Sequence, residues 1–132
     1  MPTVIRRSSQ TTLQGRRDVL QAVSWNRRSS LWNPPTDVYE TDDAYVVRVE
    51  IAGMREEDFE VAFENKILVI TGSRPDRSER RAYHQMEIQS GKFATAVGLA
   101  APVEVETATA EYAEGFLTIR LPKAKPNSVK VD

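Results

Sequence analysis

The side chains of this sequence that could take part in acid–base chemistry are mostly acidic, and they lie in two short clusters. Asp42-Asp43 is the first and Glu56-Glu57-Asp58 is the second. Paired carboxylates serve as general acid and base when a histidine, a suitable lysine or a metal cluster accompanies them. Neither cluster has such a partner in the sequence. We therefore expect a solvated turn at Asp42-Asp43 and a helix-like corner at residues 56–58.

Other kinds of reactive site are missing as well. His84 is the single histidine and cysteine is absent, which excludes a histidine-rich zinc site, thiolate metal sites and a disulfide framework. The sequence has no HExxH, no GxSxG and no glycine-rich phosphate loop. We therefore predict a protein that is not an enzyme and that uses no cofactor or metal. The lack of cysteine also fits a reducing cytoplasm, which is the predicted location.

Charge is distributed unevenly along the 132 residues, although the net charge is only −1. Residues 1–33 carry six arginines against Asp18, a net charge of +5, so the remainder carries −6. A basic arm can bind nucleic acid through counterion release. Here the arginines are interleaved with apolar residues: Leu13, Val19, Leu20, Val23, Trp25, Leu31 and Trp32. We therefore expect an arm that binds apolar surface, and we expect no nucleic-acid partner.

The length allows one domain after this arm. We expect a flexible arm over residues 1–33, largely disordered or with a short helix at residues 16–25, because Asn33-Pro34-Pro35 ends any helix. The opening residues lack the apolar core of a signal peptide, and no run of about 18 apolar residues could span a membrane. These patterns predict a soluble, unsecreted protein.

After residue 35 the hydrophobic period becomes two, as in β-strands. Tyr45, Val47, Val49 and Ile51 alternate with polar or smaller residues, and further alternating stretches lie at residues 59–64, 67–73, 92–99, 107–112 and 116–122. Asn65-Lys66 and Glu114-Gly115 predict tight turns. Residues 83–89 alternate weakly and could form a strand that projects from the body. Seven or eight short strands with little helix predict an antiparallel β-sandwich.

The last seven residues, PNSVKVD, contain two valines that flank one lysine. Chain ends are usually poorly ordered, so this triplet could be a frayed tail. It could equally be a short strand that docks elsewhere, because alternate residues of a strand point to one face.

The run from Trp32 to Pro122 resembles the α-crystallin domain of small heat-shock proteins. The order of PTDVYETDDAYVVRVEIAG, EEDFEV, NKILVITGSR, SGKF and EYAEGFLTIRLPK is similar to that family's order of strands and turns. The most specific element is the A-x-x-x-N-G-V-L signature, which appears as AEYAEGFL at residues 110–117. The resemblance implies an all-β, immunoglobulin-like antiparallel β-sandwich over residues 34–123, followed by a C-terminal extension over residues 124–132.

The resemblance also implies how the tail docks. Family members typically end in an I/V-x-I/V motif, which Val129, Lys130 and Val131 match. In relatives this motif adds along a groove between two edge strands of a neighbouring subunit and covers a surface that is otherwise prone to stick. The corresponding groove residues here are Phe59, Val61, Ala108, Ala110 and Tyr112.

The stretch between residues 72 and 91 bears on the type of dimer. In bacterial and plant relatives a strand in this loop crosses to the partner's sheet, and in the animal type it is fused with its successor. Ser90-Gly91 interrupts such a fusion, so we expect a swapped loop that pairs near residues 36–40 of the partner. Its residues would be Tyr83, His84, Met86 and Ile88. Thr95 stands where the family often has an arginine, which affects the charge contacts expected at the dimer interface.

By this resemblance the protein is an ATP-independent holdase, an oligomer of dimers that binds partly unfolded client proteins and prevents their aggregation. Trp25, Leu31 and Trp32 are the client-binding candidates, although they could also pack inside the oligomer. The alternative is a monomeric interaction module similar to the CS-domain co-chaperones. Those commonly carry an acidic tail, whereas KAKPNSVKVD is basic, so assembly is favoured.

Overall fold

The computed structural model describes residues 2–4, 31–76 and 82–125. The helix expected at residues 16–25, Trp25 and the motif Val129–Val131 lie outside these ranges. Within these ranges the strands are β1 (Pro2–Val4), β2 (Thr36–Glu40), β3 (Ala44–Glu50), β4 (Phe59–Glu64), β5 (Ile67–Arg74), β6 (Gly91–Gly98), β7 (Thr109–Ala113) and β8 (Phe116–Pro122). The same ranges contain two single-turn 3₁₀ helices, η2 (Glu56–Asp58) and η3 (Val105–Thr107). η2 is the helix-like corner that the acidic cluster predicted.

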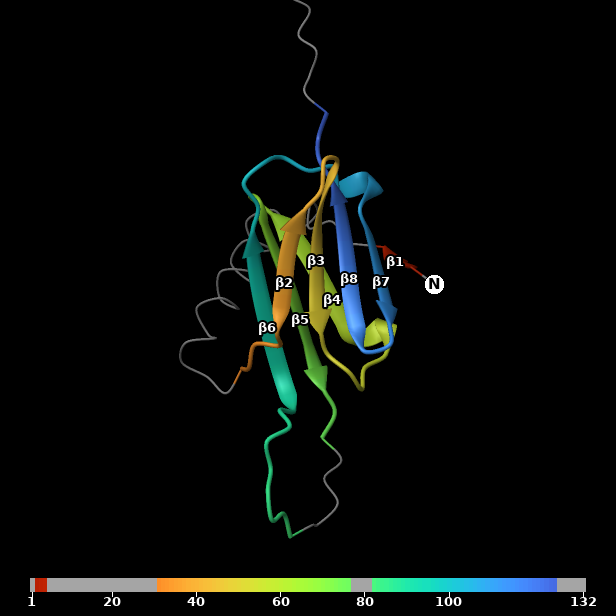
Figure 1. The fold of residues 1–132 in the computed structure, drawn as a ribbon. Coiled ribbons are helices and arrows are strands. Elements are labelled where there is room, and N and C mark those ends of the chain that lie inside the picture. The colour runs from red at the N-terminus through yellow and green to blue at the C-terminus, as the bar shows by residue number, and fades with distance from the viewer. Residues whose placement is uncertain (1, 5–30, 77–81, 126–132) are drawn as a thin grey trace, which may run out of the picture.

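The strands form two sheets that pack face to face (Figure 1). One sheet has the order β1-β7-β8-β3-β2 and the other has the order β4-β5-β6. Every pair of neighbouring strands is antiparallel. The structure therefore confirms the prediction of an all-β antiparallel sandwich, and it does so with eight strands among the described residues.

The core lies between the sheets, where the alternating apolar positions meet. Val47, Val49 and Ile51 at one side of the core are fully buried. They pack in the same cluster as the buried residues of β5 and β8: Leu68, Ile70, Leu117, Ile119 and Leu121. The period-two pattern of the sequence therefore corresponds to the inward face of each sheet.

Two predicted turns have the backbone geometry that a two-residue hairpin requires. Asn65 and Lys66 have φ of 54° and 64°, and Glu114 and Gly115 have φ of 53° and 84°. Positive φ at both central residues is typical of the type I′ turn, whose twist matches that of the flanking strands. These turns fix the register of β4 with β5 and of β7 with β8.

Three features depart from the sequence analysis. Pro2–Val4 forms a strand, although the arm was expected to be largely disordered or helical. Residues 82–90 project as a loop and form no strand with either sheet of this chain (Figure 1). Trp32, which was assigned to the arm, is packed against the core cluster. Both β1 and Trp32 are held in place by backbone pairing with the outer side of another strand. A pattern of alternating apolar residues gives no sign of such pairing.

Candidate functional site

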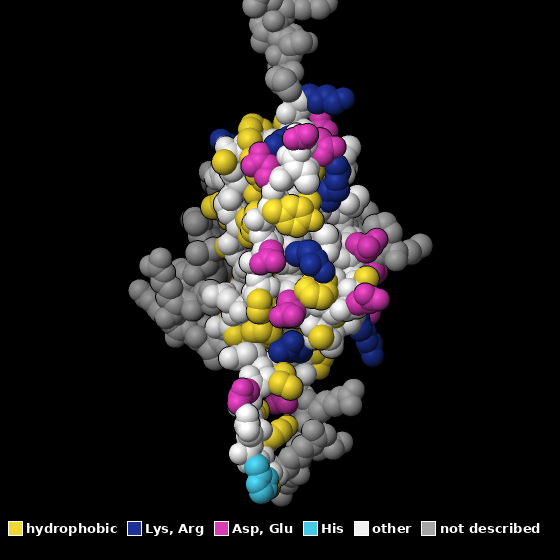
Figure 2. Space-filling model, viewed as in Figure 1, with side chains coloured by type: hydrophobic (Ala, Val, Ile, Leu, Met, Phe, Trp, Pro, Cys, Tyr) yellow, Lys and Arg dark blue, Asp and Glu magenta, His cyan; other side chains and the backbone are white. Residues whose placement is uncertain are grey.

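Large exposed apolar side chains gather on two segments in the described part of the chain. Tyr83, Met86 and Ile88 on the loop 82–90 are 50%, 59% and 80% exposed, and Val38 and Tyr39 on β2 are 45% and 50% exposed. β2 ends its sheet, with β3 as its one described neighbour. Figure 2 shows the loop extending from the body, with its histidine at the far end. An extended apolar segment and an open sheet edge are the two parts needed for strand addition.

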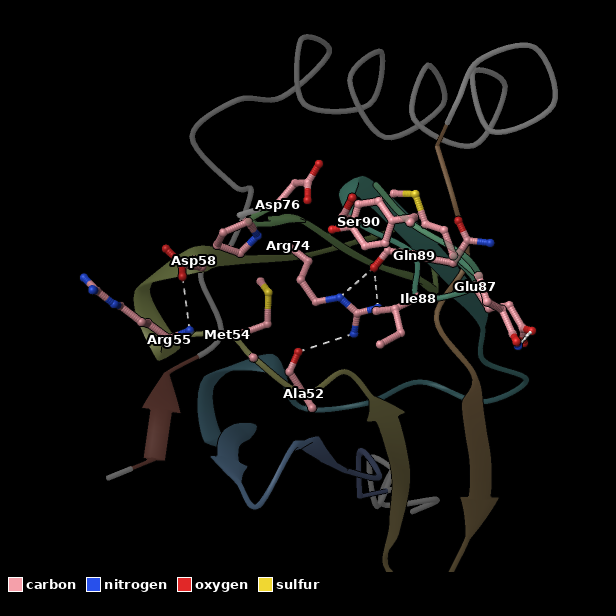
Figure 3. Close-up of a pocket in the computed structure, with 15 residues that line it drawn as sticks. Ala52, Met54, Arg55, Asp58, Arg74, Asp76, Glu87, Ile88, Gln89 and Ser90 are labelled. Carbon is pink, nitrogen blue, oxygen red and sulfur yellow. Dashed lines mark hydrogen bonds between the residues drawn. The ribbon is translucent and has the colours of Figure 1, made fainter. Parts of the chain in front are cut away.

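Arg74 holds the base of this loop. Its Nε donates a hydrogen bond of 2.8 Å to the carbonyl oxygen of Gln89, Nη2 donates to the same oxygen, and Nη1 lies 3.4 Å from the carbonyl oxygen of Ala52. The guanidinium also lies 4.5 Å from the ring centroid of Trp32. Figure 3 shows Arg74 between the loop and the turn that contains Ala52, and it is one of the residues that line a cleft of about 840 Å³. The planar guanidinium therefore joins three segments that are distant in the sequence.

We predict that Arg74→Lys loosens the loop, because an ammonium cannot reproduce the fork of donors or the stacking on the indole. The amides of residues 89–92 should exchange hydrogen several-fold faster, and the free energy of unfolding should fall by about 1–2 kcal/mol, as for loss of hydrogen bonds from a partly exposed charged group. Lys92→Met on β6 is the control, and it should change neither quantity. Unchanged exchange in Arg74→Lys would show that the loop base is held by other contacts.

The outer edge of β6 is covered by the chain's own segment around Trp32. The Trp32 amide donates to the carbonyl oxygen of Lys92 at 3.2 Å, and the Ala94 amide donates to the carbonyl oxygen of Trp32 at 3.1 Å. The indole Nε1 donates to the carbonyl oxygen of Gly91 at 3.2 Å, and the indole packs edge-on against Phe93 with 5.7 Å between ring centroids. Thr95 Oγ1, at the position where the family often has arginine, lies 3.3 Å from Thr36 Oγ1.

Of the residues assigned to the docking groove, Phe59 and Val61 lie on β4, Ala110 and Tyr112 lie on β7, and Ala108 directly precedes β7. Phe59 and Tyr112 bring their ring centroids to 5.2 Å. The Tyr112 hydroxyl donates to the carbonyl oxygen of Ile51 at 2.8 Å and accepts from the Met54 amide at 3.2 Å. The other members, which are Val61, Ala108 and Ala110, are buried, as is Phe59. These contacts bring together two strands from different sheets, and β1 lies along the β7 edge.

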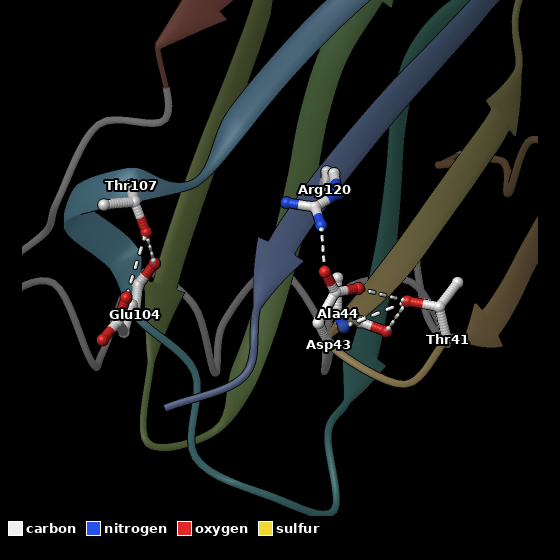
Figure 4. Close-up of polar contacts among 6 residues, drawn as sticks. All are labelled: Thr41, Asp43, Ala44, Glu104, Thr107 and Arg120. Atoms are coloured by element: carbon white, nitrogen blue, oxygen red, sulfur yellow. Dashed lines mark hydrogen bonds and ion pairs between the residues drawn. The ribbon is translucent and has the colours of Figure 1, made fainter. Parts of the chain in front are cut away.

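Asp43, in the acidic cluster before β3, is held by contacts with neighbouring side chains. Thr41 Oγ1 donates to Asp43 at 3.0 Å and Arg120 Nη2 donates to it at 3.2 Å, as Figure 4 shows. The Thr41 hydroxyl and the Arg120 charge lower the pKa of Asp43 below its usual value. The ionised form is therefore favoured in the folded protein, so this carboxylate stabilises the fold near neutral pH and loses that effect only in acid. The cluster thus belongs to the turn that joins β2 to β3.

The described residues contain no group of three or more His, Cys, Asp or Glu side chains that could hold a metal ion. Within the same residues no helix has the length and apolar character needed to cross a membrane.

Comparison with known proteins gives the family. The sequence model of the Hsp20/alpha crystallin family matches residues 37–131. The chain belongs to this family. It is a small heat-shock protein with an α-crystallin domain, and such proteins are chaperones rather than enzymes.

Relatives from bacteria and plants support the assignment. The chain is 31% identical over 99 residues to small heat shock protein C2 of Rickettsia felis, a match over 74% of this chain and 64% of that protein. It is 30% identical over 120 residues to a 16.9 kDa class I heat shock protein of Triticum aestivum, over 87% and 80% of the two chains. The chain thus spans about two thirds of the length of the Rickettsia relative.

Solved structures support the fold. Heat shock protein 16.0 of Schizosaccharomyces pombe superposes with a TM-score of 0.66 at 27% identity, over 76% of this chain and 96% of that chain. A small heat-shock protein of Xylella fastidiosa, whose structure is described as having a distinct high order structure, gives a TM-score of 0.64 at 26% identity, over 76% of this chain and 97% of that chain.

Sequence reasoning named the docking and loop residues but missed two parts of this surface. Arg74 gave no signal, because one arginine at the end of a strand is common. The role of Trp32 at the β6 edge also went unrecognised, although Trp32 lies directly before Asn33-Pro34-Pro35, where an extended backbone is expected.

Proposed function

We propose that this small heat-shock protein is an ATP-independent holdase that assembles from dimers into larger oligomers. The observation that carries the proposal is the placement of the exposed large apolar side chains of the described residues, which all lie on β2 and the loop 82–90. Such side chains on a sheet edge and a projecting segment mark an interaction surface rather than an inert exterior. The cytoplasmic location stays a prediction from the composition.

The proposed dimer exchanges loops. The loop of one subunit, with Tyr83, His84, Met86 and Ile88, lies along the open edge of β2, residues 36–40, of its partner, and the partner's loop does the same in return. Burial of the apolar side chains on both segments favours this arrangement. The competing arrangement, in which matching β6 strands pair, would displace the backbone hydrogen bonds that Trp32 makes with the β6 edge.

The proposed oligomer is held by tails. Val129 and Val131 of one subunit would add to the groove between β4 and β7 of another, with Lys130 between them facing away. β4 ends one sheet, whereas β7 belongs to the other sheet and is paired with β1 at its outer side, so a docked tail would have to take the place of β1 along β7.

Client binding is assigned to the arm. Trp25, Leu31 and Trp32 are large apolar groups that suit adaptable contacts with unfolded chains. Trp32 is packed on Phe93 and Arg74, so it would contact a client only after leaving the β6 edge.

The test of the proposed function is suppression of aggregation. A model client is heated, or reduced, with the purified protein in the absence of nucleotide, and light scattering is followed. Protection should appear at near-equimolar ratios and should not change when ATP is added. Deletion of residues 1–30 removes β1 but keeps Trp32 and the strands β2 to β8, so circular dichroism should still report β-structure while protection weakens severalfold. No protection at any ratio, or protection that requires ATP, would overturn the proposal.

The co-chaperone alternative makes a different prediction about size. It requires a monomer that acts on another chaperone, so light scattering after size-exclusion chromatography distinguishes the two. A monomeric wild-type protein would contradict assembly through loops and tails.

A further inference from the structure

A strand from the chain's own N-terminus lies along the β7 edge that the tail is proposed to use. β1 is antiparallel to β7, with Pro2 opposite Glu111, Thr3 opposite Ala110 and Val4 opposite Thr109. Figure 1 shows β1 at the outer side of β7, and β1 is the end strand of its sheet. The backbone groups on the open side of an edge strand can pair with only one further strand. β1 and a docked tail therefore exclude each other wherever their registers overlap.

We propose that β1 is a built-in competitor of the C-terminal V-x-V motif and covers the β7 edge of subunits that have received no tail. This inference rests on the proposed function, since it concerns the same groove. The backbone of β1 suits a temporary cover. Proline is tolerated at the first residue of an edge strand, and Pro2 has no N–H with which a further strand could pair. A subunit waiting for a partner would thus display less unpaired backbone.

The short length of β1 keeps the cover reversible. It pairs over three residues, whereas β7 itself is five residues long. Its advantage is that it belongs to the same chain, so its pairing with β7 is intramolecular and does not weaken when the protein is diluted. A competitor that covers roughly 70–90% of the edges lowers the apparent affinity of the tail by about three- to ten-fold.

The experiment starts from the full chain with Val129→Ala and Val131→Ala, so that its own tails do not compete. The probe is a fluorescent peptide with the sequence of residues 124–132, AKPNSVKVD, and binding is measured by anisotropy. The test variant adds Thr3→Pro with Val4→Pro, which removes two backbone donors from β1. The control variant adds Ser8→Pro with Ser9→Pro, the same change in the arm outside β1.

The peptide should bind the test variant about three- to ten-fold more tightly than the starting protein, and the control variant should match the starting protein. Without peptide, amides of Thr109–Ala113 should exchange hydrogen faster in the test variant, and added peptide should restore their protection. Equal peptide affinity in all three proteins would overturn the competitor while leaving tail docking intact. Absence of binding in all three would overturn tail docking, and the competitor with it.

Discussion

Replacing both valines of the C-terminal motif, Val129→Ala with Val131→Ala, is expected to convert large oligomers into dimers while the sandwich stays folded. Each substitution removes two methyl groups, and a buried methylene-sized group is worth about 0.8 kcal/mol. Two fully buried valines therefore lose about 3 kcal/mol together, or roughly a hundred-fold in the dissociation constant of one tail. One docked tail is weak on its own, because association also costs translational and rotational freedom.

The change in particle size should exceed the change at one site. In a closed assembly each tail after the first docks as an effectively intramolecular event, so small losses at every site act together. Because each single tail binds weakly, subunits of the wild-type protein can exchange: individual tails can leave while others stay bound. Exchange of this kind is what a holdase needs in order to expose apolar surface reversibly.

Native mass spectrometry of the double variant beside the wild-type protein measures this effect. Lys130→Ala is the matched control, because it makes a similar truncation at the position between the two valines and should leave the size distribution unchanged. If the double variant keeps the wild-type distribution of large oligomers, the last residues are a frayed tail and the assembly is held by other contacts.

The sandwich could be predicted from the sequence because one face of nearly every strand is buried. When a face is buried, a shift of one residue would place the whole apolar set in water, so alternation specifies the strand and its orientation. This holds for β3, where Val47 and Val49 are fully buried, and for β8, where Leu117 and Ile119 are buried. Turns such as Asn65-Lys66 add the register, since their backbone geometry suits a two-residue connection.

Features that depend on backbone pairing with an edge could not be predicted in this way. β1 pairs over only three residues, which is too short for a period to be visible. The segment at Trp32 joins β6 by two backbone hydrogen bonds, and backbone groups are the same in every sequence. Gly72 within β5 is a related case. A Cβ at that position would lie 2.6 Å from the Phe93 ring, so the glycine makes room for an aromatic side chain that the pattern of β5 does not reveal.

The candidate site was predicted unevenly for the same reason. Phe59, Val61 and Ala110 were named from a resemblance; Phe59 and Val61 lie on β4, which ends its sheet, whereas Ala110 lies on β7, whose outer side is paired with β1. Arg74 was missed, because its importance comes from the carbonyl groups of Gln89 and Ala52, which reach it only in the folded chain. When a side chain binds the backbone of distant segments, no local sequence pattern identifies it.

Charging the projecting loop with Met86→Asp and Ile88→Asp is expected to give a folded monomer. In this structure 59% of Met86 and 80% of Ile88 are exposed, so both side chains have surface left to bury. Full burial of such a side chain is worth about 1.5–3 kcal/mol, and a two-fold symmetric dimer contains each contact twice. Even partial burial therefore sums to about 4 kcal/mol, which corresponds to at least about a thousand-fold in the dimer dissociation constant.

Analytical ultracentrifugation over a range of concentrations measures this constant, with the Val129→Ala and Val131→Ala changes present so that tails do not add to the size. Ala100→Asp is the matched control, because it introduces the same charge at an exposed position after β6 and should leave a dimer. Tyr39→Asp on β2 tests the other half of the contact and should weaken the same dimer, since Tyr39 is half exposed on the edge proposed to receive the loop.

Residues 82–90 contribute nothing to the buried core cluster, so circular dichroism of the loop variant should match that of the starting protein. A loop variant that remains a dimer would favour pairing of matching β6 strands, and loss of protection at the Trp32 and Ala94 amides would then be expected, because that pairing displaces the hydrogen bonds those amides make.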